Sequence, residues 1–127
     1  MVYPGRMADT SHALSTSVLK ERLEAAFPSL LEELTQLVAI PSVSSDPAHA
    51  ADVERSAEHI RERFAALGLE AKVLRETAAD GTEGKPALVA HTPHIEGAPT
   101  VLLYAHHDVQ PVGELSRWSM DPYKAEV

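Results

Sequence analysis

His106, His107 and Asp108 are the residues of this chain whose types and spacing are best suited to chemistry. They directly follow the apolar residues 100–105, and ligand sites of open α/β sheets usually form at the ends of such strands. Because side chains alternate along extended backbone, we expect His106 and Asp108 to point to one side and His107 to the other. One imidazole nitrogen can then bind a metal ion while the carboxylate accepts the other ring N–H. The spacing alone fits such a site and a simple His–Asp hydrogen bond at a strand end about equally well.

The other histidines are weaker candidates for metal ligands. His91 and His94 flank residues 92–93, where a proline breaks any helix that would align the two rings, so both are expected in a surface loop. His49 and His59 lie in or beside a predicted helix, away from its apolar face, and are expected to face solvent.

The serines at positions 42, 44 and 45 lack the sequence context of a catalytic nucleophile. Neither a Gly-x-Ser-x-Gly turn nor a paired base accompanies Ser42, Ser44 or Ser45 in the sequence. Loop and capping roles are expected for them instead. Trp118 is expected to pack near the mouth of the site.

Composition limits the classes of partner and of metal site. The chain has 127 residues, enough for one modest domain. Its 11 basic and 19 acidic residues give a formal net charge of -8, which disfavours nucleic acid and anionic membranes as partners. Without cysteine, a metal must be bound by histidine and carboxylate. Residues 1–10 lack the hydrophobic centre of a secretory signal and no apolar run could span a bilayer, so a cytoplasmic location is expected.

Two helices are predicted in the first half of the chain. Apolar residues at three- and four-residue spacing mark the first over residues 17–39, where Pro28 should either kink the helix or begin a second one. The second is expected over residues 46–67, because Asp46 suits the N-cap and Gly68 suits a left-handed stop.

Beyond these helices the period of the apolar residues becomes that of strands. Alternation predicts a half-buried strand over residues 69–73, and a short apolar stretch predicts another over residues 87–90. Residues 100–105 are apolar without alternation, as expected of a strand covered on both faces. A further strand is expected to start within residues 123–127. Helices followed by strands, one of them buried, indicate an α/β fold.

Residues 101–112 resemble a motif of a known family. Their sequence is Val-Leu-Leu-Tyr-Ala-His-His-Asp-Val-Gln-Pro-Val. It closely resembles the first metal-binding motif of zinc peptidases that include carnosinase-like dipeptidases, glutamate carboxypeptidases, aminoacylases and acetylornithine deacetylases. Residues 37–44 and 65–69 are similar to the segments that precede this motif in the family, and Trp118 with residues 122–123 to the stretch that follows it. The Asp-Val-Gln-Pro form of the motif looks most like the dipeptidase branch.

The resemblance implies roles for two residues and a fold. His106 matches the family's zinc-binding histidine, and Asp108 matches the active-site aspartate that orients it, whereas His107 falls at a variable position and is expected to be a bystander. The implied fold is α/β, the N-terminal part of a three-layer mixed-sheet catalytic domain. Residues 17–127 would form this incomplete part and residues 1–16 a loosely ordered N-terminus.

The resemblance also implies a two-zinc peptidase whose general base, bridging carboxylate, other ligands and lid lie beyond Val127. The expected function is therefore hydrolysis of dipeptides or small peptides by a longer parent protein, which could be a homodimer, while this fragment alone is inactive. Two alternatives stay open: an amidase or deacylase of N-acyl amino acids, and a metal-free α/β binding module. A single histidine cannot bind zinc tightly, because zinc sites need three or four protein donors.

Overall fold

The computed structural model describes residues 15–125. Its elements in chain order are the helices α1, η1 and α2, the strands β1 and β2, and the short helix η2. The contacts between residues divide the chain into two compact units, Met1–Glu33 and Leu34–Val127. The buried residues described below, and every residue of the candidate site, belong to the second unit.

The first long helix, α1, covers Thr16–Val38 and confirms the helix predicted at residues 17–39. Ser15 precedes it, and the hydroxyl of Ser15 accepts a hydrogen bond from the amide of Val18 at 3.4 Å. The helix continues through Pro28, so a second helix does not begin there. A loosely ordered N-terminus was expected over residues 1–16. Residues 1–14 lie outside the described range, and Thr16 already belongs to the helix.

The second helix, α2, covers Ala50–Ala66 and is preceded by the 3-10 turn η1, Pro47–His49. As predicted, Asp46 caps this start: its carboxylate accepts a hydrogen bond from the amide of Ala48 at 2.9 Å. Gly68 ends the helical segment with a φ of 80°, which is the left-handed conformation expected of it.

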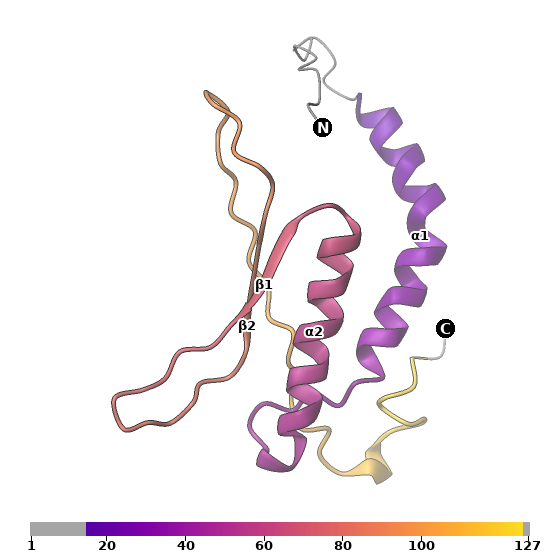
Figure 1. Cartoon of the computed structure of the whole chain (residues 1–127). Helices are drawn as coiled ribbons and strands as arrows, with labels where there is room; N and C mark the ends of the chain where they lie inside the picture. Colours follow the sequence, from indigo (N-terminus) through magenta and orange to yellow (C-terminus); the bar gives the residue numbers. More distant parts are fainter. Residues whose placement is uncertain (1–14, 126–127) are drawn as a thin grey trace. The chain divides into compact units, whose positions relative to one another are not determined.

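The strands β1 (Glu70–Leu74) and β2 (Ala87–His91) form an antiparallel pair in which Ala71 lies opposite Ala90. Side chains along β1 alternate between exposed and half-buried, as the sequence predicted. The helix α2 packs against both strands (Figure 1). This arrangement of helix on sheet confirms the α/β class.

The core of the second unit is small and lies between the loop that follows α1 and the buried face of α2. Its apolar members are Ile40, Val43, Val53 and Ala57. Two serine side chains, Ser42 and Ser56, are buried in the same place. Because buried hydroxyls need hydrogen-bond partners, their burial indicates a specific acceptor nearby.

The prediction of a buried strand at residues 100–105 is wrong for this structure. Residues 101–104 are between 76% and 90% exposed and are not assigned to a strand. In the described part of the chain the sheet has only β1 and β2, so neither a neighbouring strand nor a second layer covers residues 100–105. An unbroken apolar run indicates burial only when other segments cover it.

The C-terminal part contains one short helix, η2, at Leu115–Arg117. The ring N–H of Trp118 donates to the carbonyl of Val112 at 2.9 Å. The expected strand at residues 123–127 is not formed at residues 123–125. Residues 122 and 123 form a turn instead, closed by a hydrogen bond from the amide of Lys124 to the carbonyl of Asp121; residues 126 and 127 lie outside the described range. Within residues 15–125, the structure contains no helix of the length and apolarity that crossing a membrane requires.

Candidate metal site

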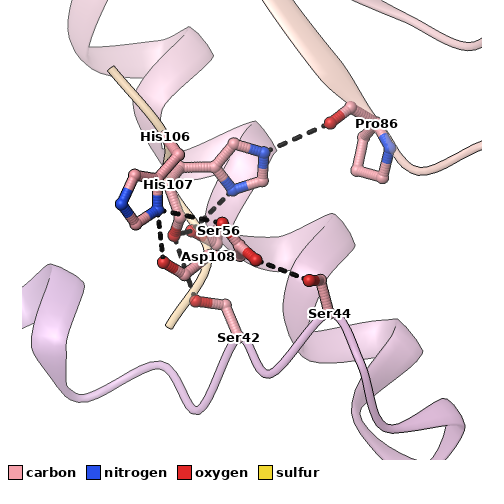
Figure 2. Close-up of polar contacts among 7 residues, drawn as sticks. All are labelled: Ser42, Ser44, Ser56, Pro86, His106, His107 and Asp108. Atoms are coloured by element: carbon pink, nitrogen blue, oxygen red, sulfur yellow. Dashed lines mark hydrogen bonds and ion pairs between the residues drawn. The ribbon is translucent and has the colours of Figure 1, made fainter. Parts of the chain in front are cut away.

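His106 and Asp108 point to the same side of the chain and contact each other, as the alternation predicted (Figure 2). Nδ1 of His106 lies 3.0 Å from Oδ1 of Asp108 and 3.0 Å from the carbonyl oxygen of the same residue. Both oxygens of this contact are acceptors, so Nδ1 carries the ring proton. In the neutral ring, Nε2 then keeps a free lone pair.

This tautomer is the one that a metal ligand needs. The side chain of His106 is 72% exposed, so the lone pair of Nε2 is accessible to a ligand from solvent. The carboxylate behind the ring fixes its orientation and tautomer, as carboxylates do behind many zinc-bound histidines. The pair therefore fits one imidazole donor of a metal site.

Ser44 holds the other oxygen of the Asp108 carboxylate. Its hydroxyl donates to Oδ2 over 2.5 Å. This hydrogen bond is the main cause that keeps the pKa of Asp108 below its usual range; the ring of His106 acts in the same direction, and burial opposes both. Asp108 thus faces His106 as a carboxylate acceptor with a fixed orientation.

The loop after α1 holds the motif by its backbone as well. The amide of Val109 donates to the carbonyl of Ser42 at 3.1 Å, and Val43 and Val109 form an isolated parallel bridge. The hydroxyl of Ser42 donates to the carbonyl of His107, also at 3.1 Å. Residues 42–44 therefore hold residues 107–109 directly.

His107 points away from His106, as expected, but it is not a bystander (Figure 2). Its Nδ1 lies 3.2 Å from Oγ of Ser56 on α2, and its Nε2 lies 3.2 Å from the carbonyl oxygen of Pro86, just before β2. Oγ of Ser56 also donates to the backbone carbonyl of His107 at 3.1 Å. The variable position of the motif is thus fixed by contacts to two other elements.

Sequence analysis missed the roles of Ser42, Ser44 and Ser56. The first two were expected to serve in loops or caps, and Ser56 was not considered. Their partners lie between 51 and 65 residues away along the chain, so local patterns carry no signal for these bonds. A serine on the apolar side of α2, next to Ala57, was the one available hint.

The remaining histidines do not join this site. Nδ1 of His49 contacts a carboxylate oxygen of Asp52 at 2.8 Å, and both His49 and His59 are half-buried rather than fully solvent-facing. His91 and His94 are exposed, as predicted, although His91 ends β2. Over residues 15–125, groups of three or more potential ligand side chains close enough to hold a metal ion are absent. The described residues therefore provide one imidazole donor and its carboxylate partner.

An open depression surrounds this donor. Its lining includes Ser44, Lys85, Tyr104, His106 and Asp108. The acceptor carboxylate and the accessible ring nitrogen of the pair thus face a space that a small ligand can enter.

Comparisons with known proteins identify the class to which this motif belongs. The chain is 30% identical over 97 residues to a cysteinylglycine-S-conjugate dipeptidase of Corynebacterium striatum, covering 76% of the chain and 20% of that protein. It is 29% identical over 121 residues to the Cys-Gly metallodipeptidase DUG1 of Candida albicans, covering 90% of the chain and 25% of that protein. No protein-family model matches the chain.

A solved structure shows the same relationship. The chain superimposes on the dipeptidase Dug1p of Saccharomyces cerevisiae with a TM-score of 0.73 and 25% identity, over 82% of this chain and 23% of that one. The resemblance to the dipeptidase branch of the metallopeptidase family is thereby confirmed. The chain spans a fifth to a quarter of the length of the relatives it matches.

Proposed function

We propose that this chain contributes to the metal-dependent hydrolysis of dipeptides, with His106 as a zinc ligand and Asp108 as the residue that orients it. The observation that carries the proposal is the contact of Nδ1 of His106 with Oδ1 of Asp108, which leaves Nε2 accessible. The dipeptidase names of the relatives support the substrate class. Their metallodipeptidase names support a metal, and the choice of an imidazole with a carboxylate behind it favours zinc.

The residues of this chain have limited parts in such a reaction. His106 would supply a lone pair to the metal from Nε2, and Asp108 keeps the ring proton on Nδ1 by accepting its hydrogen bond. Zinc, when bound, supplies Lewis-acid polarisation of the peptide carbonyl and a water of lowered pKa. Since catalytic zinc sites use three protein ligands, turnover requires donors beyond this pair. We further propose that a protein of the relatives' length holds two zinc ions at this centre.

Zinc binding by the purified chain tests the metal role directly. Binding of Zn²⁺ is measured by calorimetric titration of the original chain and of His106→Ala, and the ring 15N signal of His106 Nε2 is followed by NMR in the chains that keep this ring. His94→Ala serves as the control, because it removes an imidazole that is exposed and distant in sequence from the motif. We expect weak binding that is lost in His106→Ala and kept in His94→Ala. Equal binding by all three chains would refute the role of His106, and no binding in any of them would favour the metal-free binding module.

Activity tests the substrate class. We expect the chain by itself to show no turnover of Cys-Gly or other dipeptides, because one imidazole is too few donors for catalysis. In a protein of the relatives' full length that carries this segment, dipeptides should be cleaved and N-acyl amino acids should not. Faster turnover of N-acyl amino acids would instead support the deacylase alternative.

A further inference from the structure

The ring of His107 is held at both of its nitrogens, by residues from two different elements. Nδ1 contacts Oγ of Ser56 and Nε2 contacts the carbonyl oxygen of Pro86, each at 3.2 Å (Figure 2). Ser56 is fully buried on α2, and Pro86 immediately precedes β2. A half-buried imidazole with both nitrogens engaged has little rotational freedom.

The chemistry of the partners assigns the ring protons. The carbonyl of Pro86 can only accept, so Nε2 of His107 carries a proton and donates it. In the neutral ring, Nδ1 then carries only a lone pair, and it shares the single hydroxyl proton of Ser56 with the backbone carbonyl oxygen of His107. The ring therefore bridges two elements: Nε2 donates to the residue before β2, and Nδ1 contacts the hydroxyl of Ser56 on α2.

The backbone of the same residue is held too. The carbonyl of His107 accepts hydroxyl hydrogen bonds from Ser42 and Ser56, each at 3.1 Å. Since His107 lies between His106 and Asp108, restraint of its ring and carbonyl restrains the backbone that aims both neighbours. A shift of its peptide plane would change the distance between Nδ1 of His106 and Oδ1 of Asp108.

We propose that His107 is a positioning residue of the metal site, whose ring sets the orientation of the His106–Asp108 pair by bridging Ser56 and Pro86. The inference rests on the proposed function for its consequence in metal binding, but the bridge itself can be measured without metal. The proposal gives a role to His107, whose ring points away from the side chains of His106 and Asp108.

Three substitutions of His107 separate the hydrogen bonds from simple filling of space. His107→Ala removes both ring contacts. His107→Gln can place an amide N–H near the position of Nε2 and restore the bond to Pro86, and His107→Asn can place an amide near Nδ1 and restore the contact with Ser56. His94→Ala is the control for loss of an exposed imidazole.

Two quantities are measured in each chain. One is the dissociation constant for Zn²⁺, from the NMR titration of the His106 ring. The other is the hydrogen-exchange rate of the Val109 amide in the metal-free chain, since this amide donates to the carbonyl of Ser42 at 3.1 Å. We expect His107→Ala to weaken zinc binding by about 10-fold or more and to speed Val109 exchange by about fivefold. His107→Gln should recover most of both losses, and His94→Ala should change neither.

Each other outcome has a defined meaning. If zinc affinity and Val109 exchange in His107→Ala match those of the original chain, or if His107→Gln is as impaired as a folded His107→Ala, the positioning role is overturned. If His107→Ala does not fold, recovery of both quantities in the Gln or Asn chain supports the role, and recovery in neither overturns it. If the original chain binds no zinc, the proposed function fails, and Val109 exchange alone decides whether the bridge positions the motif.

Discussion

The hydroxyl of Ser44 and the ring of His106 share one carboxylate: Ser44 donates to Oδ2 of Asp108 at 2.5 Å, and His106 faces Oδ1 at 3.0 Å. The loop after α1 therefore determines which oxygen of Asp108 is available to the imidazole. A carboxylate with one oxygen already bonded cannot rotate without losing a hydrogen bond, so its orientation is restricted. The orientation of His106 thus depends on a residue 62 positions earlier in the chain.

Substitution of Ser44 by alanine should weaken zinc binding at His106 by about fivefold, because it removes the bond that fixes the Asp108 carboxylate. Ser44→Thr keeps the hydroxyl and should retain most of the affinity. Ser45→Ala is the matched control, since Ser45 is exposed and its side chain makes no hydrogen bond to the residues of the described range 15–125. The measurement is the Zn²⁺ titration of the His106 ring. An unchanged affinity in Ser44→Ala would contradict the dependence.

Val53→Ala should destabilise the second unit by roughly 2 kcal/mol, because Val53 is 2% exposed at the centre of the small core. The loss should also loosen the face of α2 that carries Ser56. Val89→Ala makes the same change at a position that is 48% exposed, and should cost under about 1 kcal/mol. Urea unfolding followed by circular dichroism measures both. Equal losses at the two positions would show that the core is not centred on Val53.

Gly84→Ala should disrupt the connection between β1 and β2. A Cβ atom at residue 84 would lie 2.9 Å from the backbone carbonyl oxygen of Glu76, which also accepts the Gly84 amide bond at 2.8 Å. Because backbone cannot move aside cheaply, we expect a loss of roughly 1–3 kcal/mol and shifted NMR signals at His107, whose ring bonds to nearby Pro86. Gly81→Asn is the comparison without a steric clash: no atom lies within 4 Å of a Cβ there, and asparagine adopts the positive φ of 84° at a smaller cost than most other side chains. Signals at His107 that stay in place would contradict this link.

Asp80 should make the stability of this connection depend on pH in the acid range. Backbone and side-chain hydrogen bonds from Thr82 lower the pKa of Asp80 in the folded chain. The pKa of Asp80 is therefore lower in the folded chain than in the unfolded chain, where it is about 3.9. The ionised carboxylate stabilises the fold at pH values above about 3.9, and this stabilisation is lost as the pH falls through the folded-state pKa. Asp80→Asn should therefore be less stable than the original chain near neutral pH and equally stable in strong acid. Unfolding curves across this range measure the difference, and a difference that stays constant with pH would contradict it.

The elements that the sequence predicts correctly are those with local causes. The capping carboxylate of Asp46 and the positive φ of Gly68 act within a few residues of their own positions, so their residue types suffice. The alternation along β1 is equally local. Residues 100–105 were predicted wrongly because burial depends on segments elsewhere, and the described residues provide none that cover them.

The same distinction applies to the site. The contact between His106 and Asp108 spans two residues and follows from the alternation of side chains. The bonds from Ser42 and Ser56 to His107 span 65 and 51 residues and depend on how the loop, α2 and the motif meet. Sequence patterns therefore predicted the contact between His106 and Asp108, and they carried no signal of the serines that hold this segment in place.

The carbonyl of His107 accepts hydrogen bonds from a loop and from a helix at once. This shared acceptor links two equilibria, the docking of α2 and the ordering of the segment that contains His106. Thermodynamic linkage is reciprocal, so a ligand that binds only the ordered segment favours the docked helix by the free energy that couples the two equilibria. A rise in the melting temperature of α2 on addition of a ligand would therefore report binding at His106 from a distance, in an assay that requires neither catalysis nor a substrate.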